Sequence, residues 1–130
     1  MIFDTDVLIW FLDDDPAAVQ LIDSVDNRAV SIVTEMELLQ GARSKLDART
    51  IKDLLRSPRF RVISLTEAIG EVALDLIEDH ALRDGLRVAD ALIAATARET
   101  GQTLGTGNVR HFRSIPRLTL KHFRPRRQLR

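Results

Sequence analysis

The chain opens with MIFDTDVLIW, in which the three apolar residues before Asp4 predict a short buried strand. Asp4 then lies at the carboxyl end of that strand, the edge where an open sheet covered by helices binds its ligands. The apolar run over residues 7–12 predicts a buried helix directly after the strand. Asp4 or Thr5 would cap this helix, and capping alone is an alternative explanation for the aspartate.

Apolar periodicity predicts that short strands and helices alternate along the rest of the chain. We expect helices over residues 16–25, 34–42, 47–56, 66–80 and 88–100; the apolar stripe of the second ends at 42. Further strands are expected over residues 28–33, 60–65, 102–105 and 118–120. Such an alternation pairs strands in parallel through right-handed crossovers. The sequence therefore predicts an α/β fold, a three-layer α/β/α sandwich with a small parallel sheet. Residues 1–130 form one domain, with a basic tail from about residue 124.

The composition is typical of a soluble globular protein, with 45% hydrophobic and 29% charged residues. Cysteine is absent, so any metal must be held by oxygen or histidine ligands. The longest apolar run is far shorter than the ~20 residues that span a bilayer. Asp4 and Asp6 also interrupt the segment in which a secretory signal would lie. We therefore expect a cytoplasmic protein with no membrane association.

Acidic and basic residues lie at opposite ends of the chain, although the formal net charge is zero. Residues 1–27 contain aspartates but no lysine or arginine, and no acidic residue follows Glu99. The basic residues of the end are Arg110, Arg113, Arg117, Lys121, Arg124, Arg126, Arg127 and Arg130. This segment is either a solvated end, disordered past Pro125, or a cationic rim that guides a polyanion towards an acidic centre.

Polar residues that can bind a metal recur at comparable places in the predicted fold. Asp4 follows the first strand, Glu37 lies on the helix after the second, Asp90 lies in the first turn of the helix before the fourth, and Asn108 follows that fourth strand. In a parallel sheet these four positions face the same edge.

Each of these residues also has a purely structural explanation. Thr34 and Glu37 match a capping box, in which the glutamate reaches back to the amide of the cap residue. Asp90 would favour a helix N-terminus through the macrodipole, by less than ~1 kcal/mol. Asn108 follows Gly107 and is a residue type that turns favour.

Three carboxylates brought together require a positively charged partner. At ~5 Å and an effective dielectric near 20, each pair repels by about 3 kcal/mol, so three carboxylates cost roughly 10 kcal/mol. A domain with a stability of about 5 to 15 kcal/mol does not tolerate that cost alone. Oxygen ligation favours Mg²⁺, with Mn²⁺ as the alternative, and the bound water of such an ion is a nucleophile. Together with the basic segment, these residues favour phosphodiester hydrolysis.

The same residues resemble the PIN-domain ribonucleases, in particular the VapC-type toxins of type II toxin-antitoxin systems. The resemblance covers nearly the whole chain and lies in four motifs: MIFDTDVLIW, SIVTEMELLQGA around Glu37, ADALIAATARETG around Asp90, and LGTGNVRHF. It implies a small parallel sheet flanked by helices and a Mg²⁺-dependent endoribonuclease that cuts structured cellular RNA. It also implies a cognate antitoxin that inhibits the enzyme, and a homodimer.

By this resemblance Asp4, Asp90 and Glu37 are metal ligands, and Glu37 contacts the ion directly or through water. Thr5 is the hydroxyl neighbour of the first aspartate and a supporting residue. Asn108 falls where many members of the family have a fourth acidic residue, so we include it among the catalytic residues.

The sequence departs from the family pattern at two further positions. Asp6 stands where serine or asparagine is frequent, and its carboxylate is expected to replace part of the missing charge at Asn108. Gly107 replaces a position that is often arginine, so a phosphate contact is expected to move to Arg110. His111 is expected to be a surface histidine rather than a ligand.

Two other functions fit parts of the sequence. Asp4, Thr5 and Asp6 resemble the start of the haloacid-dehalogenase-like phosphatases, although that family has a glycine where Val7 stands and requires a longer chain with a lysine and a later acidic pair. A catalytically inactive module that binds RNA or a partner protein is the other alternative, and Asn108 is its best support.

A docking surface for the antitoxin is less well defined. Trp10, Phe11 and Leu12, together with the helix that begins at Pro16, would offer an apolar groove to an antitoxin helix. Packing in the core explains these side chains equally well.

Overall fold

Five short strands form one parallel sheet in the computed structural model, which describes residues 1–127. The strands are β1 (Ile2–Phe3), β2 (Ala29–Ser31), β3 (Arg61–Ile63), β4 (Leu104–Thr106) and β5 (Leu120–His122). Their order is β3-β2-β1-β4-β5, and every neighbouring pair is parallel. The first strand of the chain is therefore the central one, and the end of β1 meets the end of β4, because Ile2 pairs with Leu104 and Phe3 with Gly105.

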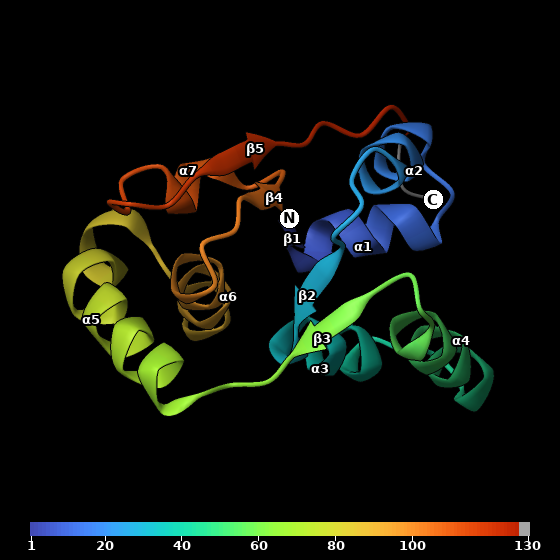
Figure 1. Ribbon diagram of the computed structural model, residues 1–130, viewed down its shortest axis with the longest axis horizontal. Coiled ribbons are helices and arrows are strands. Elements are labelled where there is room, and N and C mark those ends of the chain that lie inside the picture. Colours follow the sequence, from blue (N-terminus) through green and yellow to red (C-terminus); the bar gives the residue numbers. More distant parts are fainter. Residues whose placement is uncertain (128–130) are drawn as a thin grey trace.

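Within residues 1–127, seven helices cover the two faces of this sheet (Figure 1), and all but the short last one were predicted from the sequence. The helices are α1 (Thr5–Leu12), α2 (Pro16–Asp23), α3 (Ile32–Gln40), α4 (Lys45–Arg56), α5 (Glu67–Asp84), α6 (Val88–Glu99) and α7 (Val109–Phe112). Figure 1 shows α5 and α6 on one side of the central strands and α1, α2 and α4 on the other. The predicted α/β/α sandwich is confirmed. No helix within residues 1–127 combines the length and the apolar composition that crossing a membrane requires.

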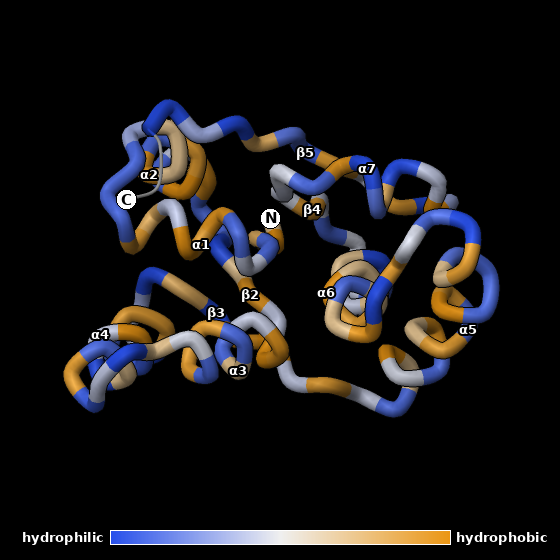
Figure 2. The backbone as a smooth tube through the Cα atoms, turned by 180° about the vertical axis from the view of Figure 1, so that it is seen from behind, coloured by the Kyte–Doolittle hydropathy of each residue, from blue (hydrophilic) through white to orange (hydrophobic). Residues whose placement is uncertain are grey.

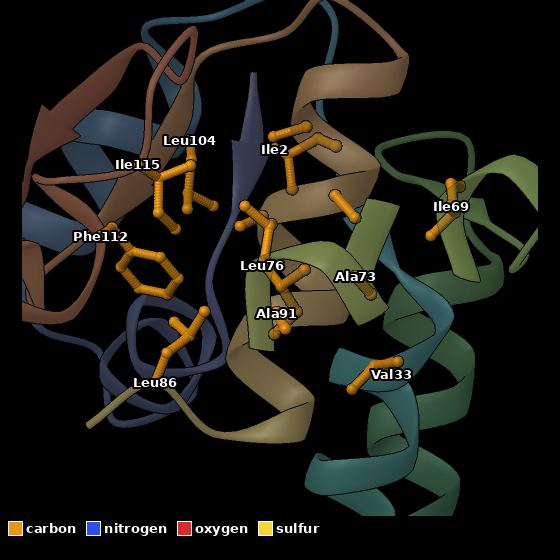
Figure 3. Close-up of a cluster of buried hydrophobic side chains, with 14 of the residues drawn as sticks. Ile2, Val33, Ile69, Ala73, Leu76, Leu86, Ala91, Leu104, Phe112 and Ile115 are labelled. Carbon is orange, nitrogen blue, oxygen red and sulfur yellow. The ribbon is translucent and has the colours of Figure 1, made fainter. Parts of the chain in front are cut away.

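Neighbouring residues of the central strands belong to different hydrophobic cores, because side chains alternate between the faces of a sheet. Ile2 and Ala29 lie in one buried cluster with the small residues of α6, and Phe3 and Val30 lie in another with residues of α1, α2 and α4. Figure 3 shows part of the first cluster, where Phe112 and Ile115 lie beside Leu104.

Small side chains make α6 the most deeply buried helix. The alanines at 91, 94, 95 and 97 are fully buried, and so is Ile93. Because alanine projects little from the helix, the backbone of α6 approaches the sheet closely. This packing fixes the position of the first turn of α6, which carries Asp90.

Two predicted element ends differ from the structure for local reasons. The third helix begins at Ile32 rather than Thr34, because the side chain of Ser31 caps it by accepting from the Val33 N–H. The proposed capping box of Thr34 and Glu37 is therefore wrong. The fifth helix continues past residue 80 to Asp84, where Gly85 ends it with a φ of 73°.

The chain end at residues 126–127 is anchored on the corner between α1 and α2, and both views show the segment after β5 running to α2 (Figures 1 and 2). The backbone N–H groups of Arg126 and Arg127 donate to Asp15 Oδ1 at 2.8 and 2.6 Å. The other carboxylate oxygen of Asp15 caps α2 by accepting from the Ala18 N–H. The sequence left a disordered end past Pro125 open, and this alternative is wrong up to residue 127; residues 128–130 lie outside the described residues.

Candidate active site

Asp4 is nearly fully buried at the carboxyl end of β1 and caps α1, as the sequence predicted. One carboxylate oxygen accepts from the Thr5 N–H at 2.8 Å, and the other accepts from the Thr106 hydroxyl at 2.7 Å. Thr106 is the last residue of β4. Two adjacent strand ends therefore hold this carboxylate in a single orientation.

Thr5 connects the first strand end to α3. Its hydroxyl lies 2.6 Å from Glu37 Oε1 and 3.0 Å from Thr34 Oγ1. A hydroxyl has one hydrogen, so Thr5 donates it to the carboxylate and accepts from Thr34. Glu37 is thereby held beside Asp4 through a single intervening residue.

Asp6 points from α1 to the loop after β4, where the Gly107 N–H donates to its Oδ2 at 2.9 Å. A Cβ on residue 107 would lie 2.6 Å from that same oxygen and 3.3 Å from the Phe123 carbonyl oxygen. The structure thus explains why glycine stands at this position: the Asp6 carboxylate occupies the space that a side chain would need. The remaining oxygen, Asp6 Oδ1, is buried without a hydrogen-bond partner.

Asp90 lies in the first turn of α6 with its side chain 19% exposed. Its Oδ2 is 3.5 Å from His111 Nδ1, and that nitrogen is 2.9 Å from Asn108 Nδ2. Asn108 therefore contacts His111 and not a carboxylate. His111, which the sequence predicts to be a surface residue and not a ligand, has a side chain that is 32% exposed and lies against Asp90.

The carboxylates influence one another's ionisation. Burial and the nearby charge of Asp6 raise the pKa of Asp4 to about 7, against the opposing effect of its hydrogen bonds from Thr106 and Thr5, and Asp90 adds to the rise. Burial also raises the pKa of Asp6, with Asp90 contributing. The charges of Asp6 and Asp90 thus act on Asp4 at the carboxyl edge of the sheet, and the hydroxyl of Thr5 connects Glu37 to the residue after Asp4. We call these four acidic residues the acidic cluster.

A comparison with protein families identifies the family of this chain. Residues 1–118 match the PIN domain family. The chain belongs to the PIN domain family. No curated protein sequence matches this PIN domain.

Several solved structures have the same fold as this PIN domain. A toxin-antitoxin complex from Klebsiella pneumoniae is 28% identical, with a TM-score of 0.77 over 91% of this chain and 94% of that one. The VapBC2 structure from Rickettsia felis, bound to a DNA fragment from its promoter, is 22% identical, with a TM-score of 0.79 over 95% of this chain and 100% of that one. The VapBC-1 structure from nontypeable Haemophilus influenzae is also 22% identical, with a TM-score of 0.76 over 94% and 98% of the two chains.

The donor set of the PIN domain fits a hard divalent cation. Asp6 Oδ1 is a buried carboxylate oxygen with no partner, and the burial and the carboxylate repulsion that raise the pKa of Asp4 both disfavour its charge, which a cation would stabilise. Within residues 1–127, however, no three acidic or histidine side chains form a ready-made metal cage. Asp4 and Asp6 instead direct oxygens to Thr106 and Gly107.

Arg110 is exposed on α7, next to His111, which contacts Asp90. Together with Arg83, His111 and Arg113 it lines a second cavity. Its predicted contact with a substrate phosphate stays a prediction.

Three contributors to the site were missed from the sequence. Thr106 orients Asp4, Thr34 contacts Thr5, and His111 contacts Asp90. A hydroxyl at the carboxyl end of a strand beside the first strand would have indicated Thr106, because that edge carries the site. Thr34 and His111 gave no such signal, since their contacts depend on how α3 and α7 are packed.

Proposed function

We propose that this PIN domain is a metal-dependent endoribonuclease and the toxin of a toxin-antitoxin pair. The observation that supports the proposal is the acidic cluster at the carboxyl edge of the sheet, where burial and neighbouring carboxylates raise the pKa of Asp4 to about 7. A cluster of this kind favours a divalent cation, for which Mg²⁺ is the first choice and Mn²⁺ the second.

Asp4, Asp90 and Glu37 would hold the ion, with Asp6 as an additional carboxylate. When bound, such an ion would polarise a phosphoryl group and activate a water molecule as the nucleophile. Other residues of the chain orient these proposed ligands. The Thr106 hydroxyl and the Thr5 N–H donate to the Asp4 carboxylate, and the Thr5 hydroxyl donates to Glu37. Asn108 and His111 lie beside Asp90, where they would contact the substrate.

Cleavage of RNA by the purified protein tests the proposal. Wild-type protein is incubated with total RNA in Mg²⁺ or Mn²⁺, next to Asp4→Asn, Asp90→Asn and the exposed control Asp26→Asn. Loss of an outer-sphere partner of a metal costs about 10 to 100-fold, so loss of a ligand should reduce the cleavage rate by at least about 100-fold. The control should retain wild-type activity. Cleavage that survives both site substitutions would contradict the assignment.

The alternative, an inactive module that binds RNA or a partner, rests on Asn108, whose amide contacts His111 instead of adding a fourth acidic group. The same assay separates the two functions. An inactive module would bind RNA without cutting it in either metal, and the substitution of Asp4 would leave binding unchanged.

An antitoxin helix is the proposed partner, and an apolar groove supports it. The groove has a volume of about 490 Å³ between α1, α3 and α4, with the apolar side chains of Ile9, Leu12, Leu38, Ala42 and Ile51 in its lining. Glu37 also lines it, so a bound helix would lie beside the acidic cluster. The groove differs from the one that the sequence suggested, because Trp10 and Phe11 pack partly into the core.

The homodimer and the cytoplasmic location also belong to the proposal. Leu74 and Leu82 on α5 are 59% and 103% exposed and are candidates for a contact between two copies. Sedimentation equilibrium of the purified protein tests the dimer. The absence of cysteine suits a reducing compartment.

A further inference from the structure

A basic concave surface lies between the end of α5 and α7. This cavity, which we call the basic pocket, has a volume of about 520 Å³, and Arg83, Asp84, Arg110, His111, Arg113 and Ser114 line it. Figure 1 shows the end of α5 meeting the segment that follows α7. The pocket is formed by two segments that are distant in sequence.

The charge of the basic pocket is not neutralised from within. Arg110 and Arg113 are exposed, and neither makes an ion pair within residues 1–127. The single carboxylate of the lining, Asp84, accepts from Ser114 at 2.8 Å, lies 2.8 Å from His80 Nδ1 and pairs with Arg83 Nε at 3.4 Å, which leaves Arg110 and Arg113 uncompensated. Three arginines face one aspartate that already has these partners, so the pocket attracts an anion.

The wall of the pocket is already ordered. Hydrogen bonds with His80 and Ser114 hold the pKa of Asp84 below its usual range, so the carboxylate is ionised and connects α5 to the segment after α7. His80 is itself buried. An anion would therefore bind without first organising the backbone, which favours affinity.

His111 joins the basic pocket to the acidic cluster. It lines the pocket, and its Nδ1 lies 3.5 Å from Asp90 Oδ2. A cationic pocket and an anionic metal site thus share one side chain. A polyanion can have one phosphate at the acidic cluster, through the metal, and a neighbouring phosphate among the arginines.

We infer that the basic pocket binds a backbone phosphate of the RNA substrate next to the bond that is cut, through Arg110 and Arg113. The inference rests on the proposed ribonuclease function. Guanidinium groups suit this role, because their planar donor fork matches the phosphate oxygens.

Binding of RNA to a cleavage-deficient protein tests the inference. All proteins carry Asp4→Asn, and a fluorescein-labelled single-stranded RNA of mixed sequence is titrated in Mg²⁺ at several salt concentrations. The pocket variant is Arg110→Gln with Arg113→Gln. The matched control is Arg49→Gln with Lys52→Gln, which removes two positive charges from exposed positions on α4. Thermal unfolding shows that both variants are folded.

The pocket variant should bind about tenfold more weakly than its parent, with a salt slope reduced by about 0.7 for one lost phosphate of a single strand. The control should change neither quantity to this extent. Equal losses in the two variants, or no loss in the pocket variant, would overturn the inference.

The proposed function can fail separately. Cleavage by the wild-type active site together with an unchanged affinity of the pocket variant would overturn the phosphate site and leave the ribonuclease intact. Absence of cleavage in Mg²⁺ and Mn²⁺ together with the weaker binding of the pocket variant would overturn the ribonuclease and support the phosphate site.

Discussion

Asp4 combines two properties that proteins rarely give to one aspartate. It is nearly inaccessible to water, and it lies close to the charges of Asp6 and Asp90. Its two hydrogen bonds do not offset these effects, so its pKa rises to about 7. Near neutral pH the Asp4 carboxyl group can therefore lose its proton when a cation binds.

The stability of the metal-free protein should reflect this pKa. Below about pH 4 Asp4 is protonated in both states, whereas between about 4 and 7 the folded state holds more protons than the unfolded chain. Stability therefore falls as pH rises through that window, by roughly 2 to 4 kcal/mol from Asp4. Urea unfolding in EDTA at pH 5 and pH 8 measures this decrease in the free energy of unfolding. Because other carboxylates also titrate, the same measurement is made on Asp4→Asn, which should lack the part of the decrease that comes from Asp4. Identical dependence of stability on pH in the two proteins would contradict the raised pKa of Asp4.

Gly107→Ala should damage the site without disturbing the core. The added Cβ would lie 2.6 Å from Asp6 Oδ2, so the carboxylate must leave its hydrogen bond to the residue 107 N–H. We expect the free energy of unfolding to fall by about 1 to 3 kcal/mol, which is typical when a side chain is added to a well-packed position. We also expect weaker binding of Mg²⁺ in isothermal titration calorimetry. Gly41→Ala is the control, because its Cβ would make only ordinary contacts at 3.6 and 3.7 Å. Unchanged metal affinity in Gly107→Ala would show that Asp6 does not contribute.

At the level of elements, α2 depends on residues from the far end of the chain. Asp15 caps it, and the same carboxylate accepts from the backbone of Arg126 and Arg127. Burial opposes the ionisation of Asp15, but these N–H groups, with that of Ala18, hold its pKa below the usual range. The cap and the anchored segment therefore form one unit.

Asp15→Ala should destabilise both parts of this unit. Loss of an N-cap alone costs about 1 kcal/mol, and the N–H groups of residues 126 and 127 lose their acceptor as well. We expect about 1 to 2 kcal/mol in urea unfolding, together with faster amide hydrogen exchange at residues 126 and 127. Asp26→Ala, a substitution at an exposed position just after α2, should change neither the free energy of unfolding nor the hydrogen exchange of residues 126 and 127. Retention of slow exchange in Asp15→Ala would mean that other contacts hold the segment.

The elements themselves were largely predictable because their local signals agree with the packing. Thr66 caps α5 by accepting from the Ile69 N–H, and the predicted apolar stripe of that helix is its buried face. The start of α3 was missed because Ser31 ends a strand and caps a helix at once, and the sequence alone does not separate a buried strand from a first helical turn.

For the whole molecule, the acidic cluster draws its residues from α1, α3 and α6, and its supports from the strand end and loop after β4. Topology predicted that Asp4, Glu37 and Asp90 lie at one edge of the sheet, because parallel strands bring their carboxyl ends there; that the three hold a metal together stays a prediction. The contacts of Thr34, Gly107 and His111 did not follow from topology, since each depends on side-chain packing across elements.

Binding of Mg²⁺ should stabilise the whole fold, because the unfolded chain disperses its ligands. At 100 times the dissociation constant, a ligand specific for the folded state adds about 2.7 kcal/mol. The rise in Tm should be larger at pH 8 than at pH 5, since Asp4 must lose its proton to bind the ion. Scanning calorimetry measures this rise, with Asp4→Asn as the comparison. An equal rise in both proteins would indicate binding elsewhere.

The central place of β1 also determines when the protein acquires its shape during translation. This strand is synthesised before the other four, yet one of its two neighbours, β4, is synthesised about a hundred residues later, and Thr106 with it. A nascent chain therefore carries Asp4 without the hydroxyl that orients it and with one edge of β1 unpaired. The ribosome that makes this PIN domain is not exposed to an assembled acidic cluster until synthesis has passed β4.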